Sequence, residues 1–352
     1  MKTRLKDIAE ATGFSVNTVS HALRDEPDIA PETKRYIREV ARQLDYIPNI
    51  PAGSIKSGRS RILSVILPDI GNPHFTIVFR EIEAYFSKRG MTPFFMNTRE
   101  DRDDEENAVR LSIAQNVDGV LICPTQADAE CVRLLDRSRV PFVLFGRHFD
   151  DPVDADYVIC DDTEGARLAT AYLLGEGHRN ICCVRYFERV SSDRERFEGY
   201  RRAFADAGVP LREDMTLPLT GSAEENREAI RRFLTGHPDC TAFLSFNDIL
   251  AYMIIREALS LGLRVPEDLS VMGFDNICSD YPFPIPLSSV SVSKKHAAQI
   301  ASELLYTRMT ERTPDPVKKH IVLPTGLFLR DTTGPVRRSD PREVPSPEKS
   351  GA

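Results

Sequence analysis

The sequence predicts a small all-α head at the N-terminus, followed by an α/β core made of two doubly wound parallel-sheet lobes. Three observations support this prediction. Residues 1–50 contain three short segments with apolar residues at helical spacing. From Arg61 onward, continuous apolar runs of strand length alternate with amphipathic segments of helix length, which is the pattern of parallel strands buried on both faces. The chain of 352 residues is also longer than one typical domain.

The composition is that of a globular protein with a sizeable core, because 41% of residues are hydrophobic and 28% are charged. No apolar run reaches membrane-spanning length, and residues 1–25 lack the apolar region of a signal peptide, so we expect a cytoplasmic protein with no membrane partner. The seven cysteines form no CxxC pair, so we expect reduced thiols and no metal site or cofactor. The net charge is −7, but residues 1–60 are slightly cationic, with ten Lys or Arg against eight Asp or Glu.

The first two helical segments form a helix-turn-helix pattern. Leu5–Thr12 is predicted to be a short helix, Gly13 the left-handed turn after it, and Ser15 the N-cap of a second helix. Ala9 lets the two backbones approach closely, and the β-branched Val19 fixes the second helix against the first.

The second helix presents side chains that can read base edges. Asn can bond adenine in bidentate fashion, and the methyl groups of Val and Thr can contact the thymine methyl. This pattern favours a DNA recognition helix, and an ordinary surface hairpin of an all-α domain is the alternative. The outward positions are Val16, Asn17, Thr18, Ser20 and His21.

A third helix begins at Pro31, because proline is favoured at the first helical position. Ala30 stands at its N-cap in place of the usual Ser, which costs on the order of 1 kcal/mol. The next segment, residues 49–60, is rich in Pro, Gly and Ser and allows two interpretations. It is a flexible linker, which its composition favours, or a short helix that forms only on DNA and presents Ile55 to the minor groove.

The core is predicted from the alternation of strands and helices. The predicted strands are Ile62–Leu67, Gly119–Cys123, Phe142–Phe145, Tyr157–Cys160, Ile181–Val184, Ala242–Phe246 and Leu269–Phe274. The predicted helices between them include Phe75–Arg89, Thr163–Leu174, Arg194–Ala207 and Ile249–Leu261. So many units fit two lobes better than one. GxGxxG, GxxxxGK[ST] and GxSxG are all absent, so the sequence offers no dinucleotide, phosphate-loop or nucleophile-elbow site, and we expect a protein that is not an enzyme.

The carboxyl ends of the predicted strands carry polar side chains. These ends are Asp69–Phe75, Gly146–His148, Asp161–Asp162, Asn247–Asp248 and Asp275–Asn276. Because ligands of such folds bind beyond these ends, the converging carboxylates, amides and arginine predict a polar small-molecule site of sugar-binding type. The alternative is that these residues only cap the following helices, and we favour this alternative for Asp162 and Asp248.

Taken together, these segments resemble the lactose/galactose repressor family of bacterial transcription regulators, over nearly the whole chain up to about Thr333. The matching stretches are LKDIAEATGFSVNTVSHAL, APETKRYIREVARQLDYIPN, the segment from Val65 to Pro73, NVDGVLICP, GEGHRNI, RFEGYRRAFADAG, AFLSFNDILA and GLRVPEDLSVMGFDNI. The resemblance implies a repressor that acts as a homodimer on a pseudo-palindromic operator, controlled by a small-molecule effector that is a sugar or related metabolite.

The resemblance also implies a domain plan. Residues 1–48 form the helix-turn-helix head, residues 49–60 the hinge, and residues 61–331 a core like that of periplasmic binding proteins, in which the chain crosses between lobes three times. Lobe one is then expected at 61–160 and 290–318, and lobe two at 161–289 and 319–331. Residues 332–352 are rich in proline and have no apolar cluster, so we expect a disordered tail.

The resemblance assigns roles to individual residues. The implied base readers are Val16, Asn17 and His21. The implied phosphate contacts are Ser20, Thr33, Tyr46 and Asn49, and Ile55 stands at the position of the minor-groove wedge. The implied effector contacts are His74, Phe75, Arg147, Arg196, Asn247 and Asp275. A sugar-binding module without a regulatory role is the alternative function, and the helix-turn-helix speaks against it.

Overall fold

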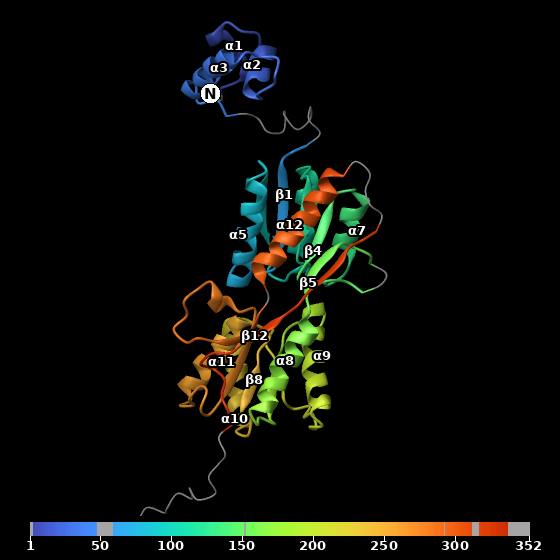
Figure 1. Ribbon diagram of the computed structural model, residues 1–352, viewed down its shortest axis with the longest axis vertical. Coiled ribbons are helices and arrows are strands. Elements are labelled where there is room, and N and C mark those ends of the chain that lie inside the picture. The colour runs from blue at the N-terminus through green and yellow to red at the C-terminus, as the bar shows by residue number, and fades with distance from the viewer. Residues whose placement is uncertain (1–2, 48–58, 151–152, 292, 312–316, 337–352) are drawn as a thin grey trace, which may run out of the picture. The chain divides into compact units, whose positions relative to one another are not determined.

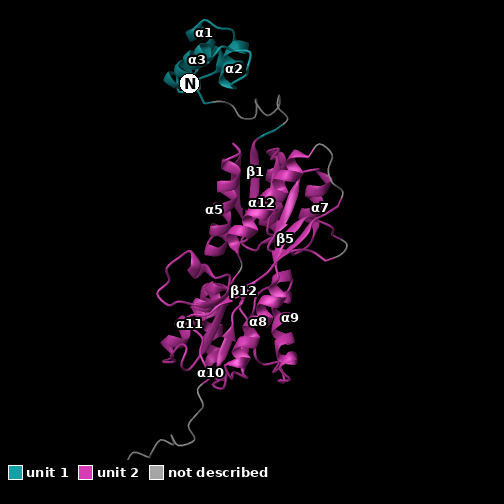
Figure 2. Cartoon of the chain, in the orientation of Figure 1, with its two compact units in different colours: residues 1–60 teal, residues 61–352 magenta. Residues whose placement is uncertain are grey.

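The structure of the chain is a computed structural model that describes residues 3–47, 59–150, 153–291, 293–311 and 317–336. It divides into two compact units, residues 1–60 and residues 61–352, which Figure 2 distinguishes by colour. No helix in the described ranges combines the length and the apolar character needed to cross a membrane.

The first unit is a three-helix head, as predicted. Its helices are α1 (Leu5–Thr12), α2 (Val16–Leu23) and α3 (Pro31–Gln43) (Figure 1). Ile8, Val19 and Ile37, one from each helix, are fully buried in its core.

The ends of these helices follow the local sequence. Gly13 adopts a left-handed conformation with φ +74°, and its N–H donates to the carbonyl of Ala9. The Ser15 hydroxyl accepts a hydrogen bond of 3.1 Å from the backbone N–H of Thr18, so the predicted N-cap of α2 is confirmed. Ala30 stands at the N-cap of α3 and supplies no side-chain bond, also as predicted.

Lobe one of the second unit contains a six-stranded parallel sheet in the order β11-β5-β4-β3-β1-β2. Its strands are β1 (Ile62–Leu67), β2 (Thr92–Asn97), β3 (Gly119–Ile122), β4 (Phe142–Phe145), β5 (Tyr157–Cys160) and β11 (His320–Leu323). Helices α5 (Pro73–Ser87) and α12 (Lys294–Thr310) cover one face, and α6 (Arg102–Ala114) and α7 (Glu130–Arg137) cover the other.

Lobe two contains a second six-stranded sheet, in the order β12-β10-β9-β8-β6-β7, in which only β12 runs antiparallel to its neighbour. Its strands are β6 (Ile181–Arg185), β7 (Thr216–Pro218), β8 (Ala242–Leu244), β9 (Ser270–Phe274), β10 (Ser288–Ser291) and β12 (Gly326–Phe328). Helices α8 (Asp162–Gly175) and α9 (Ser191–Asp206) cover one face, and α10 (Ala223–Gly236) and α11 (Asp248–Ser260) cover the other, while a 3₁₀ turn, η1 (Ile277–Ser279), follows β9.

The chain passes between the lobes three times, as expected, but the predicted boundaries near the C-terminus are wrong. β10 belongs to the sheet of lobe two, so the second crossing lies after Ser291 and not at residue 290. β11 pairs with β5 of lobe one, so the third crossing lies between Leu323 and Gly326 and not at residue 319. Both strands are only four residues long, and Val290 is the one apolar residue of β10, so neither gave a strong strand signal in the sequence.

The prediction that the tail is disordered from residue 332 is wrong for residues 332–336. Thr332 is fully buried, and its hydroxyl donates to the carbonyl of Val271 and accepts from the N–H of Ser288. The N–H of Val336 donates to the carbonyl of Glu176. The hydroxyl of Thr332 thus satisfies backbone groups near the start of β9 and β10. The proline-rich composition of this segment gave no sign of such contacts. Residues 337–352 lie outside the described residues.

Candidate functional site

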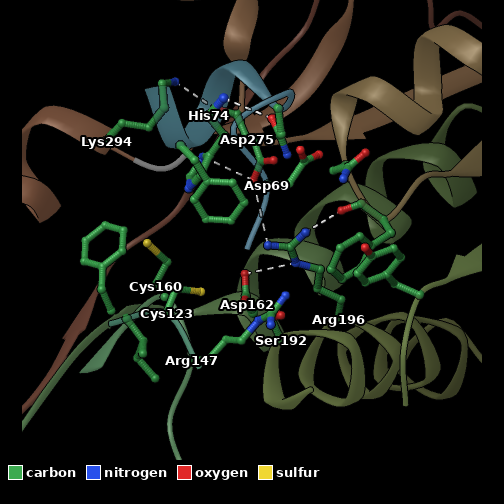
Figure 3. Close-up of a pocket in the computed structure, with 18 of the residues that line it drawn as sticks. Asp69, His74, Cys123, Arg147, Cys160, Asp162, Ser192, Arg196, Asp275 and Lys294 are labelled. Carbon is green, nitrogen blue, oxygen red and sulfur yellow. Dashed lines mark hydrogen bonds and ion pairs between the residues drawn. The ribbon is translucent and has the colours of Figure 1, made fainter. Parts of the chain in front are cut away.

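The core contains a cleft at the carboxyl ends of the parallel strands of both sheets, which is where doubly wound folds bind ligands. It encloses about 810 Å³ of empty space, open solvent at its mouth included. Figure 3 shows side chains of both lobes facing one another across it. The structure places all six residues implied for effector binding in its wall: His74, Phe75, Arg147, Arg196, Asn247 and Asp275.

Arg147, at the end of β4, is held by a buried carboxylate. Its guanidinium forms two bonds with Glu100, with Nη2–Oε1 2.6 Å and Nη1–Oε2 2.9 Å, and Nη1 also donates to the carbonyl of Pro124 at 2.8 Å. Both charged side chains are more than nine-tenths buried. This bidentate geometry fixes the plane of the guanidinium and leaves the pair with no net charge.

Arg196, on α9, lies between three acceptors. Its Nε donates to Asp162 at 3.2 Å, Nη1 donates to the carbonyl of Phe246, and Nη2 lies 3.8 Å from Asp275 Oδ1. The guanidinium carbon also stands 3.7 Å from the centre of the Phe274 ring, where the face of the ring attracts a cation. These contacts hold the planar group across the floor of the cleft (Figure 3).

The place of Arg196 depends on the close packing of α9 against α8. A Cβ at Gly199 would overlap the carbonyl oxygen of Thr163, so only glycine allows this approach. The approach brings Arg196 to Asp162, the first residue of α8. Burial raises the pKa of Asp162 to about 7, although Arg196 opposes the rise.

Asp275, after β9, is aimed into the cleft by an unusual backbone. Its φ of +103° is rare for a residue with a side chain. Lys294, the first residue of α12, stabilises this turn by donating from Nζ to the carbonyls of Asp275 and Asn276, both at 2.9 Å. His74 Nδ1 lies 3.6 Å from Asp275 Oδ1. Burial lowers the pKa of His74, so its ring is neutral at neutral pH.

The cationic side chains of the cleft are therefore already paired within the protein. Arg147 pairs with Glu100 and Arg196 pairs with Asp162. Lys294 Nζ lies 3.6 Å from the carboxylate of Asp280, and Asp69 adds a further acid to the lining. An anionic group on the ligand would meet these carboxylates, and the described residues of the cleft leave no spare cation to bind it. Neutral hydroxyl groups can instead accept from the guanidinium groups and donate to the carboxylates. Aromatic rings supply the apolar walls: Phe75, Phe145, Tyr186 and Phe246.

The helix caps differ by one residue from the prediction. Asp161 caps α8 by accepting from the N–H of Glu164, and Asn247 caps α11 by accepting from the N–H of Leu250. Asp162 and Asp248 are instead first-turn helical residues with buried side chains, so the preferred interpretation of these two as caps is wrong. The physical reason is that a cap must precede the helical residues, and each helix begins with the second of its two polar residues.

The lobes also bond each other beside the cleft. The N–H of Ser191 donates to the Gln126 side chain at 2.8 Å, and its hydroxyl accepts from the N–H of His148 at 3.2 Å. The ring of His148 pairs with Glu195 of α9, with Nε2–Oε1 2.6 Å. Gln126 and His148 belong to lobe one, whereas Ser191 and Glu195 belong to lobe two. These hydrogen bonds therefore depend on how closely the two lobes approach each other.

In the head, the predicted base readers lie on one face of α2. Val16 and Asn17 are exposed, and His21 is partly exposed. The His21 ring is held by Asp28 of the following loop, with Nδ1–Oδ2 2.6 Å.

The residues expected to contact phosphate are only partly described. Ser20, Thr33 and Tyr46 are partly exposed. Asn49 and the expected wedge Ile55 lie outside the described residues, as does most of the predicted hinge.

Sequence reasoning missed Glu100 and Lys294 in the cleft, and Asp28 in the head. Glu100 follows β2 and Lys294 follows β10, and neither strand was predicted from the sequence. Recognition of those two strands would have drawn attention to both residues. Among the described residues no group of His, Cys, Asp and Glu is arranged to hold a metal ion.

Two family models match the chain. One, described as bacterial regulatory proteins of the lacI family, covers residues 4–49. The other, described as periplasmic binding proteins and sugar binding domain of the LacI family, covers residues 60–324.

Individual relatives are similar over most of their length. The HTH-type transcriptional repressor PurR of Aliivibrio fischeri is 30% identical over 311 residues, 88% of this chain and 92% of that protein. The solved complex of the transcriptional regulator CelR with cellobiose has a TM-score of 0.69 at 26% identity and covers 94% of this chain and all of that one. A LacI family regulator from Enterococcus faecium with bound ribose has a TM-score of 0.68 at 26% identity, covering 78% of this chain and all of that one.

Proposed function

The chain belongs to the LacI family of bacterial regulatory proteins, and from this premise we propose that it is a sequence-specific transcriptional repressor controlled by a neutral carbohydrate. The observation that carries the proposal is that one chain combines two features. One is a helix-turn-helix head whose recognition face is exposed, and the other is a polar cleft whose cationic side chains are already paired with carboxylates. Neither part alone specifies a ligand-responsive regulator.

The head supplies operator recognition. Val16, Asn17 and His21 read bases in the major groove, while Ser20 and Thr33 contact phosphates and set the register of the helix. Tyr46 and Asn49 extend the phosphate contacts, and Ile55 enters the minor groove as an apolar wedge. A homodimer presents two such heads, so the operator is pseudo-palindromic.

The cleft supplies effector recognition. Asp275 and Arg196 bond adjacent hydroxyls, Arg147 and Asn247 bond further polar groups, and Phe75 stacks on an apolar sugar face. His74, neutral and without a hydrogen-bond partner at Nδ1 within the described residues, is available to a hydroxyl donor. Two of the similar solved structures hold sugars, cellobiose in one and ribose in the other, and both are consistent with this class of ligand.

Effector binding is coupled to DNA binding through the closure of the lobes. A ligand that bonds residues of both lobes favours their closed arrangement, and a change in closure orders or disorders the hinge at residues 49–60. The direction of this coupling decides whether the sugar releases the operator or promotes its binding.

Operator recognition is tested by selecting bound fragments from a genomic library with the full-length protein. We expect one enriched palindrome, lost in an Asn17→Ala variant, because the amide contributes base discrimination worth about 1–3 kcal/mol. Arg42→Ala, an exposed substitution on α3 whose side chain pairs with Glu39, is the matched control and retains the palindrome. Sequence-independent binding by both proteins would overturn the proposal.

Effector recognition is tested by calorimetry with a panel of neutral sugars, sugar phosphates and nucleobases. We expect heat only from neutral sugars, and no turnover of the sugar that binds. Tight binding of a sugar phosphate would contradict the neutral class, and sugar binding without any palindrome would favour the sugar-binding module.

A further inference from the structure

We propose that Asp28 is a specificity-determining positioning residue, which turns the His21 ring so that Nε2 faces one base pair of the operator. This inference rests on the proposed function, because it requires that α2 reads DNA. It adds a residue outside α2 that decides what α2 reads.

The geometry assigns the two ring nitrogens of His21 different roles. Nδ1 lies 2.6 Å from Asp28 Oδ2, which is a short charge-assisted bond. No hydrogen bond joins Nε2 to any residue of the described head, and His21 lies on the same helix face as the exposed Asn17, one turn earlier. Because the carboxylate can only accept, Nδ1 must carry the hydrogen, and Nε2 is the nitrogen left to face the groove.

The bond between the two side chains persists at neutral pH. The hydrogen bond from His21 lowers the pKa of Asp28, whose side chain is 55% exposed, so the carboxylate stays ionised and bound to the ring. The bond therefore fixes the orientation of the ring before DNA is bound.

The test uses full-length proteins and the operator that the wild type selects, with each half-site position replaced symmetrically by the other bases. The proteins are the wild type, His21→Ala, Asp28→Ala, Asp28→Asn and Asp25→Asn. Asp25→Asn is the matched control, because it removes a carboxylate of the same loop that bonds Lys34 and Arg38 and not His21. Binding is measured by competition, and folding by thermal denaturation.

We expect one symmetric position at which the wild type prefers a single base by about five- to tenfold. His21→Ala and Asp28→Ala abolish this preference and leave the other positions unchanged within about twofold. Asp28→Asn retains part of it, because the amide oxygen still accepts from Nδ1–H. Asp25→Asn retains all of it.

Three results would overturn the inference. Asp28→Ala could keep the base preference that His21→Ala loses. It could instead lower the affinity equally for every operator variant and also lower the melting temperature, which would indicate a structural role only. A wild type that selects no operator refutes the proposed function itself, and the inference falls with it.

Discussion

At the scale of single residues, the cleft depends on paired groups whose orientation is fixed before a ligand enters. The guanidinium of Arg196 bonds Asp162 and the carbonyl of Phe246 while it lies against the Phe274 ring. Because these contacts are made within the protein, the side chain is already ordered before a ligand binds. Ligand binding therefore does not bear the entropy cost of ordering this long side chain. Under the proposed function, the site uses the planar shape of this guanidinium as well as its charge.

Arg196→Lys tests that statement. Lysine keeps the positive charge but lacks the planar fork, so we expect effector affinity to fall about 10- to 100-fold, the value of one or two charge-assisted bonds. Calorimetry with the sugar that binds wild type measures this loss. Arg201→Lys, on the same helix but paired only with Glu198, is the control and should bind normally. Equal effector affinity of the two variants would show that a positive charge at residue 196 suffices for binding.

Asp248 makes stability depend on pH. Its buried carboxyl accepts from the Ser289 hydroxyl and the N–H of Ile277, and burial raises its pKa to about 7. Between its ordinary value of 3.8 and about 7, the folded protein holds a proton that the unfolded chain releases. Stability from this group is therefore fully present below pH 3.8 and is lost as pH rises through 7.

Asp248→Asn should remove that dependence, because an amide does not titrate. We expect the slope of unfolding free energy against pH to change by about 1.4 kcal/mol per pH unit over this window. Urea denaturation at a series of pH values measures the slope, with the exposed Asp206→Asn as control. An unchanged slope would mean that Asp248 is ionised in the folded protein.

At the scale of elements, the strength of local signals explains what could be predicted. Long apolar runs located β1, β4 and β5 to the residue, and glycine and N-cap rules located α1 and α2. β7, β10 and β12 are only three or four residues long, and β2 and β11 lie at sheet edges, so burial leaves little pattern in their sequences. Residues that come after such strands, including Glu100 and Lys294, were therefore missed.

The site residues that could be predicted are likewise those that follow strands with a strong sequence signal. His74, Arg147 and Asp275 follow strands that the sequence located, and the cleft unites them. Positions that depend on tertiary contacts could not be predicted. The left-handed turn at Asp275, held by Lys294, is the clearest case, because it joins residues 19 apart through a side chain that no local rule links.

The cap of α3 gives a prediction about a whole element. Ala30 has the extended backbone of an N-cap but no side-chain acceptor, so Ala30→Ser should stabilise the head by about 1 kcal/mol. Hydrogen exchange of α3 amides in the full-length protein measures the gain, and Ser15→Ala, which removes an existing cap, should lose a similar amount in α2. Exchange rates that change in neither helix would contradict the capping argument.

At the scale of the whole molecule, the proposed function depends on how the two lobes approach each other. The His148–Glu195 pair is one of the bonds that joins them, and Glu195 raises the pKa of His148 above its ordinary 6.5. The bond between charged groups therefore stabilises the closed arrangement below pH 6.5 and is lost as pH rises through the raised pKa.

We expect effector affinity to decrease as pH rises above 6.5, and Glu195→Gln to flatten this dependence, because closure is part of binding. Calorimetry across a pH series on both sides of that value measures the profile. Glu198→Gln, exposed on the same helix, is the control. If the pH profile of Glu195→Gln paralleled that of the wild type, the His148–Glu195 pair would not contribute to closure of the lobes.

The central claim is that the cleft and the head act on each other. The most direct test is the affinity of the full-length protein for its selected operator, measured with and without a saturating concentration of the sugar that calorimetry identifies. We predict a change of at least about fivefold, typical of allosteric coupling, which disappears in Arg196→Lys at the same sugar concentration. An operator affinity that is the same with and without bound sugar would contradict the account.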